Sequence, residues 1–407
     1  MGFKRRIANH LADLLAFGMR FGGGDKTYRF FLDALWERYP VSSSAAQNQS
    51  LDMKLYCPDY VTPGADDRAL VERIFNAFKK ASRMQEQADS NYQPSSTWRN
   101  VLRMAYAELT ESLAEDDLDR FHYFLANFAA WNEGTGIEES RLIRQSADDR
   151  SKRRHLQQKV FAPLIQWWLK LESNGRDLSA LTIPRHGNMG GMWVNGHLVS
   201  PGSVFSEINA RLLASFVQTD RPIIGELGGG FGRLFYFLSR HLKEFCYLGF
   251  DLPETLCCAS YYLIKAFPEK RFLLYGEQDW DSNSLQQFDF LLLPSFEISK
   301  LPDNRVDLFI NENSLGEVEA SACRNYVKEI CRSANAFWHR NHESCRFEFE
   351  GNATSLVNRE YPIPMDKFEA PVRYCDAGPL VRADRLNRDS DMVWYYYRAR
   401  LSDSRRS

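Results

Sequence analysis

The stretch best suited to chemistry is Glu226-Leu-Gly-Gly-Gly-Phe-Gly232, which stands between an apolar segment at 222–227 and a helical pattern that opens at Leu234. A chain that turns from a strand through glycines into a helix exposes backbone N–H groups to a ligand, with no Cβ in the way. The dinucleotide-binding fingerprint needs a glycine at the position that Arg233 occupies. The pattern therefore predicts a cofactor site, and its spacing argues against a dinucleotide.

Asp251 is a second candidate for contact with a nucleotide. It follows an apolar segment at 245–250 that is typical of the next strand. A carboxylate at this position can accept hydrogen bonds from both ribose hydroxyls of an adenosine cofactor, whether S-adenosylmethionine or NAD. The alternative is a structural role as the N-cap of the following helix, with Pro253 in its first turn.

The elements that would position these residues alternate between strands and helices. After the glycine-rich stretch, strands are predicted at 245–250, 271–275, 288–293, 306–310, 334–338 and 392–399. Such alternation predicts a parallel sheet whose sites lie at the carboxyl ends of the strands. The residues at those ends are Glu226, Asp251, Asn311, Glu312, His339 and His342. We therefore predict an α/β, Rossmann-like domain over 181–407, although the pattern does not decide which strand is third in the sheet.

The glycine spacing fits the loop with which class I methyltransferases hold S-adenosylmethionine. Together, Glu226–Gly232, Gly249–Glu254 and Asp307–Glu317 resemble the sugar O-methyltransferases of bacterial surface-polysaccharide gene clusters. The resemblance covers about residues 185–345, and it departs at Val318, where that family often has methionine. It implies a class I, S-adenosylmethionine-dependent enzyme with a carbohydrate acceptor, such as a sugar nucleotide, a glycan or a lipid-linked glycan.

The resemblance and the strand ends imply a set of cofactor-binding residues. The acid of the loop would orient the methionine amino group, and the glycines would make room for the amino-acid part of the cofactor. The predicted set is Glu226, Gly228, Gly229, Gly230, Asp251, Leu252, Pro294, Ser295 and Asn311. Pro294, Ser295 and Phe296 are predicted to flank the adenine, and Asp279-Trp280 is the alternative for that role.

Methyl transfer to a hydroxyl is an in-line displacement, so the protein has to align the acceptor oxygen and remove its proton. A sugar hydroxyl is a weak acid, which requires a general base or a metal. The predicted bases are Glu317, His342, His339 and His186. Glu317 equally suits an exposed helix, and a lone histidine is more often structural than catalytic. No grouping of Asp and His has clear metal-ligand spacing, so we expect no metal.

The N-terminal 180 residues are predicted to form a helical region. Residues 1–40 have an amphipathic pattern, and they either dock on the rest of the protein or lie on a membrane surface. Ser95 and Ser96 are candidate N-caps for a helix that carries Trp98. Apolar residues at helical spacing in this region are interpreted as core.

Composition is that of an ordinary water-soluble protein. The 407 residues are 44% hydrophobic and 26% charged, and the formal net charge of −2 gives no attraction to nucleic acid. The eight cysteines form no CxxC pair, which indicates reduced thiols. With neither a signal peptide nor a run of about 18 apolar residues, we expect a cytoplasmic protein, peripheral at the inner membrane surface if residues 1–40 bind lipid.

These observations predict an S-adenosylmethionine-dependent O-methyltransferase that acts on a sugar hydroxyl. Three alternatives stay open: methylation of a peptide or small metabolite, a methyltransferase-like scaffold without activity, and a nicotinamide oxidoreductase. The intact glycine loop and Asp251 argue against the scaffold, and Arg233 argues against the oxidoreductase. The acceptor, the hydroxyl that is methylated and the oligomeric state are not determined by these patterns.

Overall fold

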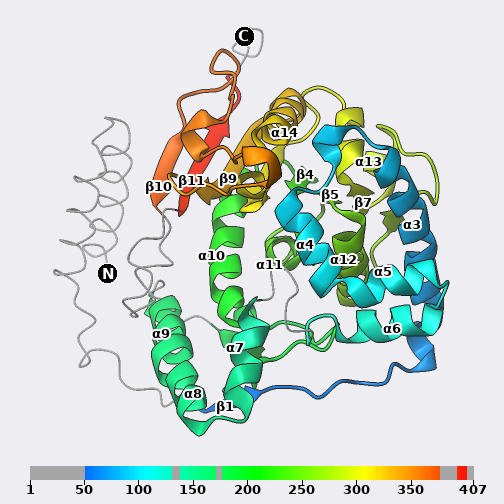
Figure 1. Cartoon of the computed structure of the whole chain (residues 1–407). Coiled ribbons are helices and arrows are strands. Elements are labelled where there is room, and N and C mark those ends of the chain that lie inside the picture. The colour runs from blue at the N-terminus through cyan, green and yellow to red at the C-terminus, as the bar shows by residue number, and fades with distance from the viewer. Residues whose placement is uncertain (1–50, 131–137, 171–176, 376–391, 401–407) are drawn as a thin grey trace, which may run out of the picture.

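The computed structural model describes residues 51–130, 138–170, 177–375 and 392–400, so the helix expected within 1–40 lies outside the described residues. Its centre is one eight-stranded sheet (Figure 1). The sheet order is β10 (Val372–Cys375), β11 (Met392–Arg398), β9 (Ala336–His342), β8 (Leu308–Glu312), β4 (Ile223–Leu227), β5 (Cys246–Asp251), β7 (Phe290–Pro294) and β6 (Phe272–Leu274). The strands from β9 to β6 run parallel, whereas β11 pairs antiparallel with β9 and β10 pairs antiparallel with β11. The predicted α/β, Rossmann-like class is confirmed.

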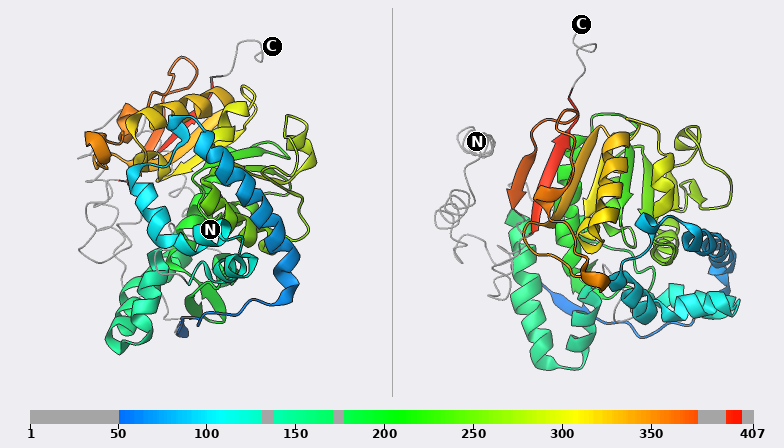
Figure 2. Two further views of the ribbon diagram at one scale, coloured as in Figure 1. Left: turned by 45° about the vertical axis from the view of Figure 1, so that its right-hand side comes forward. Right: turned by 45° about the horizontal axis from the view of Figure 1, so that its top comes forward.

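Alternate side chains of the strands enter two separate cores, one on each face of the sheet. In β4, for example, Ile224 enters one core and Ile223 the other. The helices of the first core include α10 (Pro201–Phe216), α11 (Arg233–Ser239) and α12 (Pro253–Ala266), and those of the second are α13 (Ser284–Gln287) and α14 (Ala320–Ser333). Figure 2 shows helices covering both faces. This explains why the central strands are nearly continuous apolar segments.

The pairing of strands shows which strand is third in the sheet and where His339 and His342 lie. β7 pairs with β5, so it is the third strand, and β6 lies outside it at the edge. The strand predicted at 334–338 is longer than expected, because β11 pairs with β9 along the whole of Ala336–His342. His339 and His342 therefore lie within the strand and not in the loop after it, which corrects the sequence prediction.

The described part of the N-terminal half is mainly helical and shares a core with the sheet. Its helices are α3 (Arg68–Gln87), α4 (Ser96–Ala105), α5 (Ala107–Ala114), α6 (Leu118–Asn127), α7 (Glu138–Ala147), α8 (Arg150–His155) and α9 (Ala162–Lys170). Phe75 of α3 and Phe121 of α6 belong to the same core as Tyr262 of α12. The hydroxyl of Tyr261 on α12 also donates a 2.7 Å hydrogen bond to Asp67, just before α3.

A small three-stranded sheet is built from both sides of residue 180. β1 (Met53–Tyr56) pairs with β2 (Gly191–Val194), which pairs with β3 (His197–Val199), both in antiparallel fashion. Because this sheet and the main core both join the two halves, a domain boundary at residue 180 stays a prediction. No helix in the described ranges is long and apolar enough to cross a membrane.

Candidate functional site

The glycine loop follows β4 and is tied to the neighbouring strand. The backbone N–H of Gly228 donates to the carbonyl of Phe250 in β5 at 2.8 Å. Gly230 has a φ of +58°, a conformation that L side chains rarely adopt, and a Cβ added there would meet no atom within 4 Å. Its Cα therefore faces open space. Gly229 is needed for a different reason, because its Cβ would lie 2.9 Å from Glu226 Oε2.

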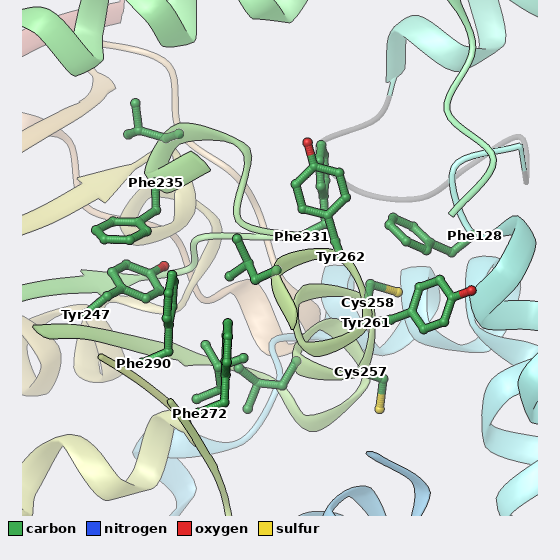
Figure 3. Close-up of a cluster of buried hydrophobic side chains, with 14 of the residues drawn as sticks. Phe128, Phe231, Phe235, Tyr247, Cys257, Cys258, Tyr261, Tyr262, Phe272 and Phe290 are labelled. Atoms are coloured by element: carbon green, nitrogen blue, oxygen red, sulfur yellow. The ribbon is translucent and has the colours of Figure 1, made fainter. Parts of the chain in front are cut away.

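Phe231 anchors the loop in the core beneath it (Figure 3). Its ring centroid lies 5.0 Å from that of Tyr262 on α12 and 6.0 Å from that of Phe128 at the end of α6. Figure 3 also shows Tyr247 and Phe235 stacked in the same cluster, with their centroids 3.8 Å apart. Phe231 is thus packed among aromatic rings, whereas a Cβ at the neighbouring Gly230 would face open space.

Asp251 ends β5 and supports the loop directly. Its Oδ2 accepts a 3.0 Å hydrogen bond from the Gly230 N–H, and its Oδ1 accepts a 2.8 Å bond from the Leu252 N–H. The N-cap of α12 is Leu252, without a side-chain hydrogen bond, and Pro253 stands in the first turn. The alternative role of Asp251 as the N-cap is therefore wrong. Burial raises the pKa of this carboxyl to about 7.

Glu226 lies inside the protein, under the loop. It is only 2% exposed, and its Oε2 accepts a 2.6 Å hydrogen bond from the hydroxyl of Tyr247. Burial raises the pKa of its carboxyl to about 7, and the nearby charges of Glu312 and Asp251 act in the same direction. Tyr247 was not among the predicted site residues, because no pattern in the sequence indicates that a side chain of β5 contacts one of β4. Direct contact of Glu226 with a cofactor stays a prediction.

A buried amide network joins the carboxyl ends of three strands. The side-chain amide of Asn311 donates to the carbonyl of Leu227 at 2.9 Å, and the hydroxyl of Ser314 donates to the same carbonyl at 3.1 Å. The amide of Asn341 on β9 donates in turn to Asn311 Oδ1 at 2.9 Å. Asn311 thus fixes the end of β4 relative to β8 and β9. Both the NH₂ group and the oxygen of the Asn311 amide are hydrogen-bonded within the protein. A contact between Asn311 and a cofactor stays a prediction.

Glu317 lies in the 3₁₀ turn Ser314–Glu317 that follows β8. Two residues of the N-terminal half contact it: the indole N–H of Trp98 donates to Glu317 Oε2 at 3.1 Å, and the hydroxyl of Ser95 donates to its carbonyl at 3.0 Å. The charge of Glu317 is near enough to Asp251 to contribute to the raised pKa of that carboxyl. Both contacts were missed, because the only signal in the sequence, the Ser95 N-cap, says nothing of tertiary partners.

His342 is the predicted histidine that lies against the turn that ends at Glu317. Its Cδ2 is 3.6 Å from the position of a Cβ built on Gly316, and its ring centroid is 5.7 Å from that of Phe347. The structure therefore places His342 next to the residue that precedes Glu317.

His339 and His186 lie elsewhere. His339 points into the other core, where its ring stacks on Tyr395 at 5.2 Å, and burial lowers its pKa to about 3. Asn358 faces this ring, but no hydrogen bond of normal geometry reaches either ring nitrogen within the described residues. His186 packs edge-on against Tyr262, well along α12, with ring centroids 6.3 Å apart, and burial lowers its pKa.

The predicted adenine-side residues lie next to Asp251. Pro294 is its partner in the β5–β7 pairing, and the hydroxyl of Ser295 accepts a 3.1 Å hydrogen bond from Tyr326 on α14. The competing residue, Trp280, donates its indole N–H to Glu297 at 2.7 Å. Pro294 and Ser295 are thus placed on the Asp251 side of the site, and their role in adenine binding stays a prediction.

Carboxylates dominate the electrostatics of this edge of the sheet. Glu254 is a third carboxyl group there, in addition to Glu226 and Asp251, and burial raises its pKa to about 7 as well. Glu312 forms a 3.3 Å ion pair with Arg340. No group of three or more His, Cys, Asp or Glu that could hold a metal ion occurs among the described residues. Carboxyl groups are thus gathered at this edge, and burial favours their neutral form.

No protein-family model matches the chain, and no curated protein matches it. Among solved structures, a protein from Pyrococcus horikoshii OT3 is 12% identical, with a TM-score of 0.32, over 49% of this chain and 92% of that one. The glycopeptide N-methyltransferase MtfA is 14% identical, with a TM-score of 0.31, over 47% and 89%. A SAM-dependent methyltransferase from Aquifex aeolicus is 15% identical, with a TM-score of 0.30, over 47% and 88%. Likeness at this level carries no argument about function, and the fold class rests on the sheet itself.

Proposed function

We propose that the protein is an S-adenosylmethionine-dependent methyltransferase. The observation that carries the proposal is the joint between Gly230 and Asp251. The Gly230 N–H donates to Asp251, and the Cα of Gly230 faces open space at the carboxyl edge of the sheet. A ribose bound next to this hydrogen bond could donate its hydroxyl protons to the Asp251 carboxylate, and no Cβ at residue 230 would clash with it. Each oxygen of that carboxylate accepts one backbone N–H and has a second lone pair for a ribose hydroxyl.

The charge of the site separates this cofactor from NAD. A sulfonium with an α-amino group would favour the ionised form of the Asp251 and Glu254 carboxyls and be attracted by it, whereas a pyrophosphate would be repelled by that form. Asp251 and the glycines of the loop would hold the nucleoside and the amino-acid part, with Glu226 and Tyr247 supporting the loop from below. Pro294 and Ser295 would lie beside the base.

We propose a sugar hydroxyl as the acceptor, and this part rests on the sequence resemblance. When bound, the cofactor supplies an electrophilic methyl group. The acceptor oxygen forms a bond to the methyl carbon, the carbon–sulfur bond breaks with its electron pair going to sulfur, and the hydroxyl proton has to leave. Glu317 is the proposed acceptor of that proton, with His342 beside it as the alternative. A peptide or a small metabolite remains the alternative substrate class.

Two further expectations from the sequence remain proposals. We place the protein in the cytoplasm, where sugar nucleotides are made, and we propose that residues 1–40 bring it to the inner membrane surface when the acceptor is lipid-linked. Flotation of the full chain with anionic vesicles, compared with a chain that lacks residues 1–40, tests the second point. Equal binding of both chains would contradict it.

The cofactor is tested by calorimetric titration of the purified protein with S-adenosylhomocysteine, with NAD as the comparator. We expect micromolar binding of S-adenosylhomocysteine, lost in Asp251→Ala, and no binding of NAD. The matched control is Asp289→Ala, which removes a partly buried carboxylate that pairs with Arg271 away from the loop. Binding of NAD alone would overturn the proposal. If the folded protein binds neither S-adenosylhomocysteine nor NAD, the alternative of a scaffold without activity is favoured.

A further inference from the structure

We propose that Trp98 is a positioning residue that holds the carboxylate of Glu317 at the site, so that a segment of the N-terminal helical region completes the active site. The proposal rests on the proposed function only for the chemical role of Glu317. The contact itself is independent of that role. It consists of the indole N–H donating to Glu317 Oε2 at 3.1 Å.

Glu317 needs an external support, because its own element is short. The turn Ser314–Glu317 is a single four-residue 3₁₀ turn without a side-chain cap, entered through Asn313 at a φ of +69°. Inside its own half, the Gly316 N–H donates to Asn341 at 3.2 Å, which fixes the backbone one residue before Glu317. The hydrogen bonds from Ser95 and Trp98 fix the carbonyl and the side chain of Glu317 itself.

Trp98 is itself well fixed. Ser95 caps α4 by accepting the Trp98 N–H at 3.3 Å, and its hydroxyl donates to Glu317 in the same arrangement. One serine therefore ties the start of α4 to the backbone of Glu317, and Trp98 in the first turn ties it to the side chain. A positioning residue on a capped helix is more precise than one on a free loop.

The segment that carries Trp98 crosses the carboxyl edge of the sheet. α3 packs on α12 at one face of the main sheet. Tyr92, in the turn after α3, lies against Tyr326 of α14 at the other face of the sheet, with ring centroids 5.6 Å apart. Tyr326 in turn donates to Ser295 beside the end of β7. After Trp98, Leu102 packs against the first core again. The segment 89–98 thus runs from the Ser295 side of the site to the Glu317 side.

This arrangement has a chemical consequence. In the proposed transfer the hydroxyl proton of the acceptor moves to Glu317, so the carboxylate has to be ionised and aimed at the acceptor oxygen. An N–H donor favours the ionised form of a carboxylate and fixes its plane. Asp251 at the end of β5 is close enough to Glu317 for their charges to interact, and the titratable ring of His342 on β9 lies next to Gly316. On the outer side of α4, Arg99 and Glu350 form an exposed pair.

The contact is tested with protein that contains 5-fluorotryptophan in place of its nine tryptophans. The fluorine signal that disappears in Trp98→Phe belongs to Trp98. We expect this signal to shift with pH as the Glu317 carboxyl ionises and to lose that transition in Glu317→Gln, while His342→Gln keeps it. A Trp98 signal that titrates unchanged in Glu317→Gln, or that never titrates, would overturn the proposal. This measurement needs no cofactor, so its failure is distinct from a failure of the proposed function.

The role is tested by methyl transfer from labelled S-adenosylmethionine to a panel of nucleoside-diphosphate sugars. We expect Trp98→Phe to lower kcat about tenfold with little change in the KM for S-adenosylmethionine, and to move the acid limb of the pH–rate profile to higher pH. The matched control is Trp168→Phe, which removes an indole N–H bond to Glu207 between α9 and α10. The control should lower stability without moving the acid limb. Equal pH profiles in Trp98→Phe and the parent would overturn the role.

Discussion

Gly230 and Asp251 are joined by a 3.0 Å hydrogen bond from the backbone N–H of one to the carboxylate of the other. The bond ties the loop after β4 to the end of β5. Support of the loop and the proposed recognition of a ribose therefore depend on the same side chain. Substitutions that separate the two functions are the most informative tests.

Asp251→Asn separates them. The amide keeps an oxygen for the Gly230 N–H, but it loses the charge, the bond from the Leu252 N–H and one of the two acceptor oxygens for a ribose. We expect the affinity for S-adenosylhomocysteine to fall about tenfold in Asp251→Asn and about a hundredfold or more in Asp251→Ala, because hydrogen bonds to charged groups contribute about 1.5–3 kcal/mol. Calorimetry measures both. Equal losses in the two variants would show that the bond to the loop adds nothing to binding, and an unchanged affinity in Asp251→Asn would contradict recognition of the ribose by the carboxylate.

The raised pKa of Asp251 predicts a specific pH dependence of stability. Its pKa is about 7 in the folded protein, above the ordinary value of 3.8, so between these values the folded state binds more protons than the unfolded state. The stability from this group is present below about pH 4 and is lost as the pH rises through about 7. We expect the free energy of unfolding of the parent, relative to Asp251→Asn, to fall across that window. Urea denaturation at several pH values measures the difference, and a flat difference would contradict it.

The Asn311 network predicts a cost in stability. Asn311→Ala leaves the Leu227 carbonyl with one donor fewer and the buried Asn341 amide without its acceptor. Buried groups left unsatisfied cost about 1–3 kcal/mol, and we expect a loss of this size in urea denaturation. The control is Asn100→Ala, at an exposed asparagine of α4 that accepts a hydrogen bond from Arg103, with an expected change within about 0.5 kcal/mol. A comparable loss in both variants would argue against the network.

The two strand histidines are expected to behave differently. His339 is buried in an aromatic cluster that includes Tyr395, so His339→Phe should leave methyl transfer unchanged and alter stability by no more than about 1 kcal/mol. His342→Ala, beside Glu317, should lower kcat several-fold. Kinetics and thermal unfolding of the two variants check this. Loss of activity in His339→Phe with intact folding would restore His339 as a catalytic candidate.

The sequence by itself determined the elements whose signal is local. The glycine loop, the apolar strands and the Ser95 N-cap each depend on neighbouring residues in the chain, so they were predicted nearly as the structure has them. The α/β class followed from the alternation of strands and helices. Local patterns also identified Asp251 at the end of a strand.

The tertiary structure alone decided which of the candidate residues meet. Alternate residues of a strand lie on opposite faces of the sheet. The positions of His339 and His342 could therefore be predicted only from the bounds and orientation of β9, which its pairing with β11 determines. The identity of the third strand of the sheet was decided by which segment pairs with β5. The contacts of Tyr247 with Glu226 and of Trp98 with Glu317 join residues that are distant in the chain or on neighbouring strands. Such contacts are set by packing across the whole fold, and no local pattern in the sequence encodes them.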